Sequence, residues 1–377
     1  MPTDTIRKEG ERMQLEPPQN DRPDLILPNG AKPRKAFEYW NLGRSYGDFC
    51  HDYENMKPPL PTFIKPIDDA LHGGLRPGVH VLGAASGSGK TAFSLLLATK
   101  IGAREKPNGE HYGVTFISEE LTSWEVRARM GSRLSRTDGN LEPYEWGDFE
   151  RLAANAARER EEGTYDFSKD RVILADLRLQ ELCPKLRIVD GARNLTTDDE
   201  NRRTSAVDLS SLNYIEMELD TAGRCGADLV IIDYLQCLDA GQNEGTNEAQ
   251  ALKTILRSIN RIGMKYNLPI LCIAALNRVK ANEIKKGGEP TMDAFRDSSW
   301  IEYTALSAWI MGPDPQASEV DDRYKHLRLT PVKIRAGEHG TDHAIDLIFE
   351  GAYGQFYWTE MNLEKDGING SIEVQAG

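Results

Sequence analysis

Residues 79–91 read VHVLGAASGSGKT and lead into the helical pattern AFSLLLATKIG, which ends at Gly102. An apolar run, a glycine-rich turn and a helical pattern in this order are typical of a phosphate-binding loop between a strand and a helix. The spacing fits the Walker A pattern, with Ala84 at the position where glycine is more usual. The stretch therefore predicts an α/β fold built on a P-loop.

The composition of this loop follows from its chemical task. Backbone N–H groups must curl around phosphates, and Gly87 and Gly89 leave room for that approach. Lys90 is expected to reach the β- and γ-phosphates, and the Thr91 hydroxyl to bind Mg²⁺. An ordinary glycine-rich turn is the alternative, and the flanking strand and helix patterns weigh against it. The expected phosphate contacts are Ala84, Ser86, Gly87, Ser88, Gly89, Lys90, Thr91 and Ala92.

A second apolar run, in ADLVIIDYLQ (residues 227–236), ends in Asp233. In open α/β sheets ligands lie at the carboxyl ends of the strands. Asp233 is therefore expected to contact Mg²⁺ directly or through water, as in Walker B sites. The alternative is an aspartate that caps the following turn, and it loses weight once Lys90 is present in the same chain.

A third apolar run, VTFISEEL (residues 114–121), ends in two carboxylates, Glu119 and Glu120. Hydrolysis needs a residue that positions or deprotonates water near the γ-phosphate, and an acid on a neighbouring strand end suits that role. We favour Glu120 as the catalytic residue, although spacing alone does not separate it from Glu119. The alternative for one of the two is an N-cap and first-turn acid for the helix that begins at Thr122.

The rest of the chain alternates strand and helix patterns. Further apolar runs of strand length occur at 269–274, 306–311 and 344–349, and helical patterns at 92–102 and 247–266. Runs that are apolar throughout are expected of strands covered on both faces. The fold class is therefore α/β, a P-loop core with a mostly parallel central sheet flanked by helices. Charged helices with exposed faces are expected within 136–169, and a surface loop at 190–204.

Four segments are expected along the chain. Residues 1–35 are polar and predict a mobile N-terminal arm. Residues 36–61 form an aromatic-rich linker, which could dock on its own domain or on a neighbouring subunit. Residues 62–360 hold the ATPase domain, and residues 361–377 form a tail.

Composition limits the class of protein. No apolar run reaches the roughly eighteen residues of a membrane span, and the N-terminus lacks a secretory signal. The five scattered cysteines favour free thiols in a reducing cytoplasm. The net charge of −13 argues against a protein coated in nucleic acid, yet it leaves room for a local basic channel.

With its three anchors in this order, the chain resembles the C-terminal motor domain of DnaB-type replicative helicases, within the RecA-like ATPases. The resemblance runs from about residue 62 to 356 and opens with IDDALHGGLRPG (residues 67–78). It implies that Glu120 is the catalytic glutamate. It also implies that IDYLQ, which ends at Gln236, is the Walker B segment, with Asp233 and Gln236 as nucleotide contacts.

Two later segments carry the rest of the resemblance. FRDSSWIE (residues 295–302) is similar to the loop that holds single-stranded DNA, which implies DNA contacts at Arg296, Asp297, Ser298, Ser299 and Trp300. VKIRAG (residues 332–337) lies where the family carries a trans-acting lysine and an arginine finger, here Lys333 and Arg335. Residues two apart on a strand point to the same side, so this pair can address one phosphate.

The resemblance implies an ATP- and Mg²⁺-dependent helicase or translocase on single-stranded DNA. It implies a ring, expected to be a hexamer, with ATP sites between protomers. A loader or another replication or recombination protein is the expected partner. We expect a cytoplasmic protein of bacterial, phage or plasmid origin, with no membrane partner.

The chain departs from the family pattern in three places. The family's helical N-terminal domain has no counterpart in the sixty or so residues before the motor domain. Ala275 stands where the family usually has a glutamine that senses nucleotide or DNA. Ser299 and Trp300 replace small residues; Trp300 could stack on a base or pack in a core or interface.

Two other functions compete with the helicase. One is a non-translocating RecA/KaiC-like ATPase that acts as a DNA-associated loader or regulator, which Ala275 and the Glu119–Glu120 pair favour. The other is a small-molecule kinase, which would leave Lys333 and Arg335 unexplained.

Overall fold

The computed structural model describes most of the second of two compact units, Met1–Lys57 and Pro58–Gly377. The described residues are 57–85, 87–190, 211–239, 248–295, 298–315, 317, 323–335, 337, 339–360 and 373–376. The expectations for the arm (1–35), for most of the linker (36–56), for the loop at 191–204 and for most of the tail (361–372) lie outside them.

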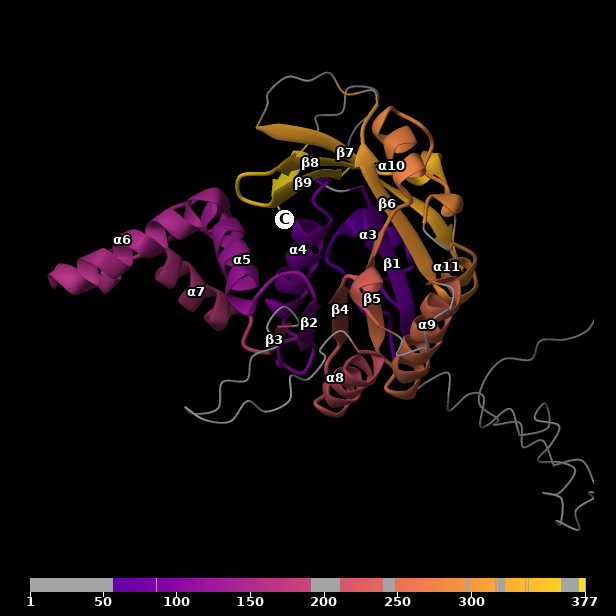
Figure 1. Cartoon of the computed structure of the whole chain (residues 1–377), viewed down its shortest axis with the longest axis horizontal. Coiled ribbons are helices and arrows are strands. Elements are labelled where there is room, and N and C mark those ends of the chain that lie inside the picture. Colours follow the sequence, from indigo (N-terminus) through magenta and orange to yellow (C-terminus); the bar gives the residue numbers. More distant parts are fainter. Residues whose placement is uncertain are drawn as a thin grey trace, which may run out of the picture. The chain divides into compact units, whose positions relative to one another are not determined.

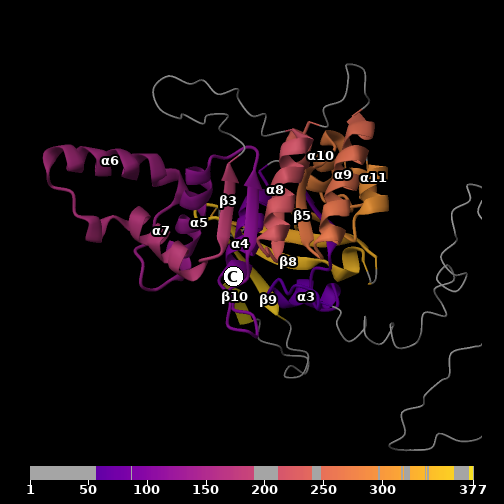
Figure 2. The same cartoon turned by 90° about the horizontal axis from the view of Figure 1, so that it is seen from below.

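The described strands form one ten-stranded sheet in the order β10-β9-β8-β7-β6-β1-β5-β4-β2-β3 (Figure 1; β10 is labelled in Figure 2). The six neighbouring strands β3, β2, β4, β5, β1 and β6 run parallel to one another. Beyond β6, the strands β7, β8, β9 and β10 are each antiparallel to the strand before them. Their bounds are β1 Gly78–Ala84, β2 Val114–Ser118, β3 Leu186–Asp190, β4 Leu229–Asp233, β5 Pro269–Ala275, β6 Ser307–Pro313, β7 Tyr324–Ile334, β8 Ile345–Glu350, β9 Gln355–Glu360 and β10 Glu373–Ala376.

Helices cover both faces of the parallel part of the sheet (Figures 1 and 2). Along β2, Phe116 packs into one core together with α4, while Ile117 packs into the other together with α8 and α9. Side chains alternate between the faces of a strand, so a strand covered by helices on both faces buries the side chains on both of its sides. This explains why β1, β2 and β4 are buried along their whole length.

The helices differ in how much they bury. Helix α6 has no buried residue and extends away from the sheet beside α5 and α7 (Figure 2). Its charged sequence explains this, because few apolar side chains are available to pack against other elements. The helices are α3 Lys65–Ala70, α4 Lys90–Gly102, α5 Ser123–Thr137, α6 Phe149–Glu162, α7 Arg171–Leu182, α8 Leu212–Arg224, α9 Glu248–Lys265, α10 Arg278–Lys285 and α11 Ser298–Thr304.

The predicted fold class is confirmed: the structure is α/β, with a mixed and mostly parallel sheet flanked by helices. The six predicted strands occur within about two residues of the expected bounds, and the charged stretch forms the exposed helix α6. Within the described residues, no helix is both long and apolar enough to cross a membrane.

Candidate active site

The P-loop joins the end of β1 to the start of α4. Gly87 and Gly89 have φ angles of 80° and 81°, which residues with a Cβ rarely adopt. A Cβ atom on Gly89 would also lie 3.1 Å from the ring of Phe349. Ala84 is still part of the buried strand β1, so its methyl group replaces the usual glycine without entering the turn.

Thr91 and Asp233 meet at the carboxyl ends of β1 and β4. The Thr91 hydroxyl hydrogen bonds to the Asp233 carboxylate, whose residue is only 1% exposed. Burial raises the pKa of the Asp233 carboxyl above its usual range, and this hydrogen bond and the charge of Lys90 oppose the rise. Lys90 lies beside them, with Nζ 5.0 Å from the centroid of the Tyr234 ring.

These residues fit an Mg²⁺ ion. The Oδ1 atom of Asp233 is buried and has no hydrogen-bond partner among the described residues. A buried carboxylate oxygen without a partner is costly unless a cation or water satisfies it. The described residues contain no group of three His, Cys, Asp or Glu side chains that could hold a metal on their own. One carboxylate and one hydroxyl, completed by phosphate and water oxygens, is the ligand set that Mg²⁺ accepts.

The two glutamates after β2 have different surroundings. The N–H of Glu119 donates to the carbonyl oxygen of Asp233 at 2.8 Å, which ties the ends of β2 and β4 together. Glu120 is exposed. Burial of the Asp233 carboxyl is the largest cause of its raised pKa, and the charge of Glu120 raises this pKa further. Neither glutamate caps α5, because Thr122 is the N-cap and Glu125 completes the capping box. The capping alternative considered from the sequence is therefore wrong.

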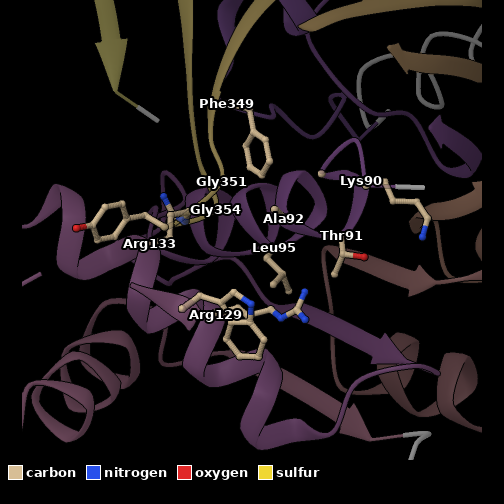
Figure 3. Close-up of a pocket in the computed structure, with 13 residues that line it drawn as sticks. Lys90, Thr91, Ala92, Leu95, Arg129, Arg133, Phe349, Gly351 and Gly354 are labelled. Atoms are coloured by element: carbon tan, nitrogen blue, oxygen red, sulfur yellow. The ribbon is translucent and has the colours of Figure 1, made fainter. Parts of the chain in front are cut away.

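A cavity of about 280 Å³ lies beside the P-loop (Figure 3). One wall is Arg129 of α5, whose guanidinium is directed toward Thr91 and stacks on the Trp146 ring at 4.1 Å. Burial lowers the pKa of Arg129, and the charges of nearby acids oppose this. The backbone N–H of Trp146 donates to the carbonyl oxygen of Ala352 at 2.9 Å, which joins this wall to the turn between β8 and β9. The other lining residues include Ala92, Leu95, Arg133, Phe349, Gly351, Tyr353 and Gly354.

Gln236 lies in a short 3-10 helix, Leu235–Cys237, that follows β4, and its side chain reaches the end of β5. Its amide oxygen accepts from the N–H of Ala275 at 2.9 Å, and its amide nitrogen donates to the Ala275 carbonyl at 3.4 Å. The side chain thus fixes the backbone at the position where a sensing glutamine was expected. The methyl group of Ala275 itself can make no hydrogen bond.

Lys333 and Arg335 contact α11 of their own chain. Lys333 Nζ donates to the carbonyl oxygen of Ala305 at 2.6 Å and to that of Glu302, and Arg335 Nη2 donates to that of Tyr303 at 2.8 Å. Burial lowers the pKa of Lys333, as does the charge of Arg335. In the single chain, both basic residues bind the C-terminal end of this helix.

The segment expected to contact DNA leads into α11. Trp300 is half-buried against the core, with Lys253 Nζ 4.3 Å and the Arg257 guanidinium 5.5 Å from its ring centroid. Its indole ring is therefore engaged by two cations of α9, while Ser299 is exposed. Ser86, Arg296, Asp297 and the Ser298 side chain lie outside the described residues.

Sequence comparisons find distant relatives of this chain. Residues 193–357 match the DnaB-like helicase C-terminal domain. A probable replicative DNA helicase from Trieres chinensis is 23% identical over 81% of this chain and 59% of its own length. The replicative DNA helicase DnaB of Geobacillus stearothermophilus is 21% identical over 84% and 60%.

This chain is a distant homologue of the DnaB-like replicative helicases.

Solved structures support the fold. A solved ATPase domain has a TM-score of 0.60 at 19% identity, over 84% of this chain and 97% of that one. A DnaB-like replicative helicase, solved in a study of its interactions with primase, has a TM-score of 0.58 at 19% identity, over 83% and 65%. The DnaB-like family implies ATP binding. The chain spans about 60% of the length of the curated relatives named above.

Sequence reasoning missed Arg129, Trp146 and Tyr353. A usable signal for the first was the capping-box pattern TSWE (residues 122–125), which places the start of α5 and puts Arg129 two turns into it. The two aromatic residues lie in separate connections, and only the folded chain brings them to one cavity.

Proposed function

We propose that this chain is an ATP hydrolase that drives movement along single-stranded DNA as a ring-shaped oligomer, expected to be a hexamer. The observation that carries the proposal is the convergence of Lys90, Thr91 and Asp233 at one sheet edge, with Glu120 on the neighbouring strand end. Distant homology to replicative helicases supports the DNA half of the proposal.

In this proposal the P-loop holds the phosphates of ATP. The N–H groups after Gly87 and the start of α4 face the phosphates, and Lys90 turns from Tyr234 to the γ-phosphate. Thr91 and Asp233 would hold Mg²⁺, which neutralises charge on the phosphates when it is bound. Glu120 orients the attacking water, because it is exposed beside the Asp233 carboxylate and carries a charge.

The nucleoside is proposed to occupy the cavity beside the P-loop. Arg129 and Trp146 would provide a stacking wall, and Tyr353 also lines the cavity. Arg335 of a second copy is proposed to complete the phosphate site, because an arginine finger stabilises the charge of the transferring phosphoryl group. The proposed DNA contacts are the residues from Arg296 to Trp300, and the proposed place of action is the cytoplasm, where ATP and DNA are both present.

ATP hydrolysis with and without single-stranded DNA tests this function. We expect Mg²⁺-dependent hydrolysis of ATP that an oligothymidylate accelerates. We expect Lys90→Ala to lower the rate of hydrolysis at least about a hundredfold. A wild-type protein that hydrolyses ATP but neither binds the oligonucleotide nor responds to it contradicts the proposal.

A second candidate is a DNA-associated loader or regulator that hydrolyses ATP without moving along DNA. The favouring observation is Ala275, which has no side-chain amide to sense bound nucleotide, while the side chain of Gln236 bonds to the backbone there. Such a protein binds a partner protein in an ATP-dependent way and displaces no strand.

A further inference from the structure

Helix α11 links two segments that the proposed function treats separately. Its first turn contains Ser299 and Trp300, from the segment proposed to hold DNA. The carbonyl groups of its last turn accept hydrogen bonds from Lys333 and Arg335, the pair that the sequence predicts to act on a nucleotide in a second copy. The helix has only seven residues, so its two ends lie within two turns of each other.

The C-terminal end of α11 depends on these donors. The last four carbonyl groups of a helix have no partner within the helix and need donors from elsewhere. Here the carbonyl groups of Glu302, Tyr303 and Ala305 accept from the two basic side chains. Positive charge at this end also opposes the negative end of the helix dipole. Short helices gain little from their own hydrogen bonds, so these contacts weigh more than they would in a long helix.

The strand β7 gives Lys333 a fixed place from which to act. Lys333 pairs with Ala308 in the ladder between β7 and β6, and the N–H of Arg335 donates to the Leu306 carbonyl at 2.9 Å. The N–H of Leu306 in turn donates to Val79 of β1 at 2.8 Å. The side chain of Lys333 therefore reaches α11 from β7, which pairs with β6. Strand β6 pairs in turn with β1, and the P-loop follows the end of β1.

Resting on the proposed function, we propose that Lys333 is a positioning residue for the DNA-contacting segment. Lys333 makes two bonds to α11 and is half-buried, whereas Arg335 makes one and is exposed. Arg335 can therefore leave for a phosphate, with which it forms a stronger bidentate contact. Lys333 then remains bonded to the C-terminal end of α11. The N-terminal end of the helix is held by the contact between the Trp300 ring and Lys253 of α9.

Hydrogen exchange of the full-length protein tests the positioning role. In Lys333→Met, the amides of residues 298–306 are expected to exchange about tenfold faster, because the helix loses two bonds and a charge at its end. Lys333→Arg keeps donors at this position and is expected to restore much of the protection. Lys325→Met is the matched control, since Lys325 is an exposed lysine on the same strand β7. Amides of β1 report global stability and are expected to be unchanged in all three.

DNA binding tests the functional part of the proposal. The affinity for a fluorescein-labelled oligothymidylate is measured by fluorescence anisotropy in the presence of β,γ-imido-ATP and Mg²⁺. We expect Lys333→Met to weaken binding about fivefold or more, and Lys325→Met to leave it unchanged. Unchanged exchange of α11 in Lys333→Met overturns the positioning role, and faster exchange with full DNA affinity overturns its link to DNA. A wild-type protein that binds no oligonucleotide refutes the proposed function instead, while the exchange experiment still decides whether Lys333 positions α11.

Discussion

Arg129 and Arg127 lie on the same helix and have different surroundings. Arg127 is exposed, and its Nε donates to Asp176 at 2.7 Å, away from the cavity. Arg129 lines the cavity and stacks on Trp146. We expect Arg129→Ala to weaken binding of a fluorescent ATP analogue about tenfold, because a charge and a stacking surface are lost together. Arg127→Ala is the control, and equal losses in the two variants would contradict a nucleotide in this cavity.

His80 gives the stability of the chain a dependence on pH. It is 2% exposed in β1 and hydrogen bonds to Ser307 Oγ and to the Arg76 carbonyl oxygen, both at 2.8 Å. Burial lowers the pKa of His80 from 6.5 to about 4. The unfolded chain therefore binds a proton that the folded chain excludes. The contribution of His80 to stability is complete above pH 6.5 and is lost as the pH falls toward 4.

Urea unfolding at two pH values measures this loss. Between about pH 7 and about pH 5, His80 is expected to reduce the free energy of unfolding by about 2 kcal/mol. His80→Gln, which gains no proton in this range, is expected to lose correspondingly less stability over the same interval. The same pH dependence in both proteins would refute the assignment to His80.

Among the elements, α5 depends on its capping box. The Thr122 hydroxyl accepts from the Glu125 N–H, and the Glu125 carboxylate accepts from the Thr122 N–H at 2.8 Å. We expect Thr122→Ala to lower the free energy of unfolding by about 1 kcal/mol, measured by urea denaturation. Thr221→Ala is the control, because its exposed hydroxyl donates to the Met217 carbonyl oxygen within α8 and caps no helix terminus. No difference between the two variants would show that the box does not hold the helix.

The central strands could be predicted because each is buried on both faces. The apolar runs that become β1, β2 and β4 stand out from the polar chain on either side. Strand β3 at the edge was missed, because Arg187 is exposed and only Val189 is buried. A half-exposed strand of five residues carries too little pattern to separate it from a loop.

The chemistry of the site divides in the same way. Lys90, Thr91 and Asp233 follow from a motif and from a strand end, so their neighbourhood could be predicted from the sequence. The cavity could not, since Trp146 and Ala352 meet only through packing of distant connections. The bonds from Lys333 to α11 were missed as well, because the sequence suggests only a basic strand end.

For the whole molecule, shared sites between copies predict a rescue. Arg335→Ala is expected to abolish hydrolysis while leaving the P-loop of its own chain intact. Lys90→Ala is also expected to abolish hydrolysis, but it impairs the P-loop and leaves Arg335 intact. Mixed at equal amounts, the two inactive proteins should recover activity at interfaces that pair an intact P-loop with an intact arginine, roughly a quarter of all interfaces in a random ring. Steady-state ATP hydrolysis over a range of mixing ratios measures this, and no recovery at any ratio would count against shared sites.

Strand displacement on forked DNA tests the motor most directly. The fork carries a single-stranded loading tail with either a 5′ or a 3′ end, and the reaction contains ATP and Mg²⁺, with Lys90→Ala as the control. The account predicts displacement from one of the two tails only, and none in the control. Robust ATP hydrolysis without displacement from either tail would contradict a motor and favour the loader or regulator.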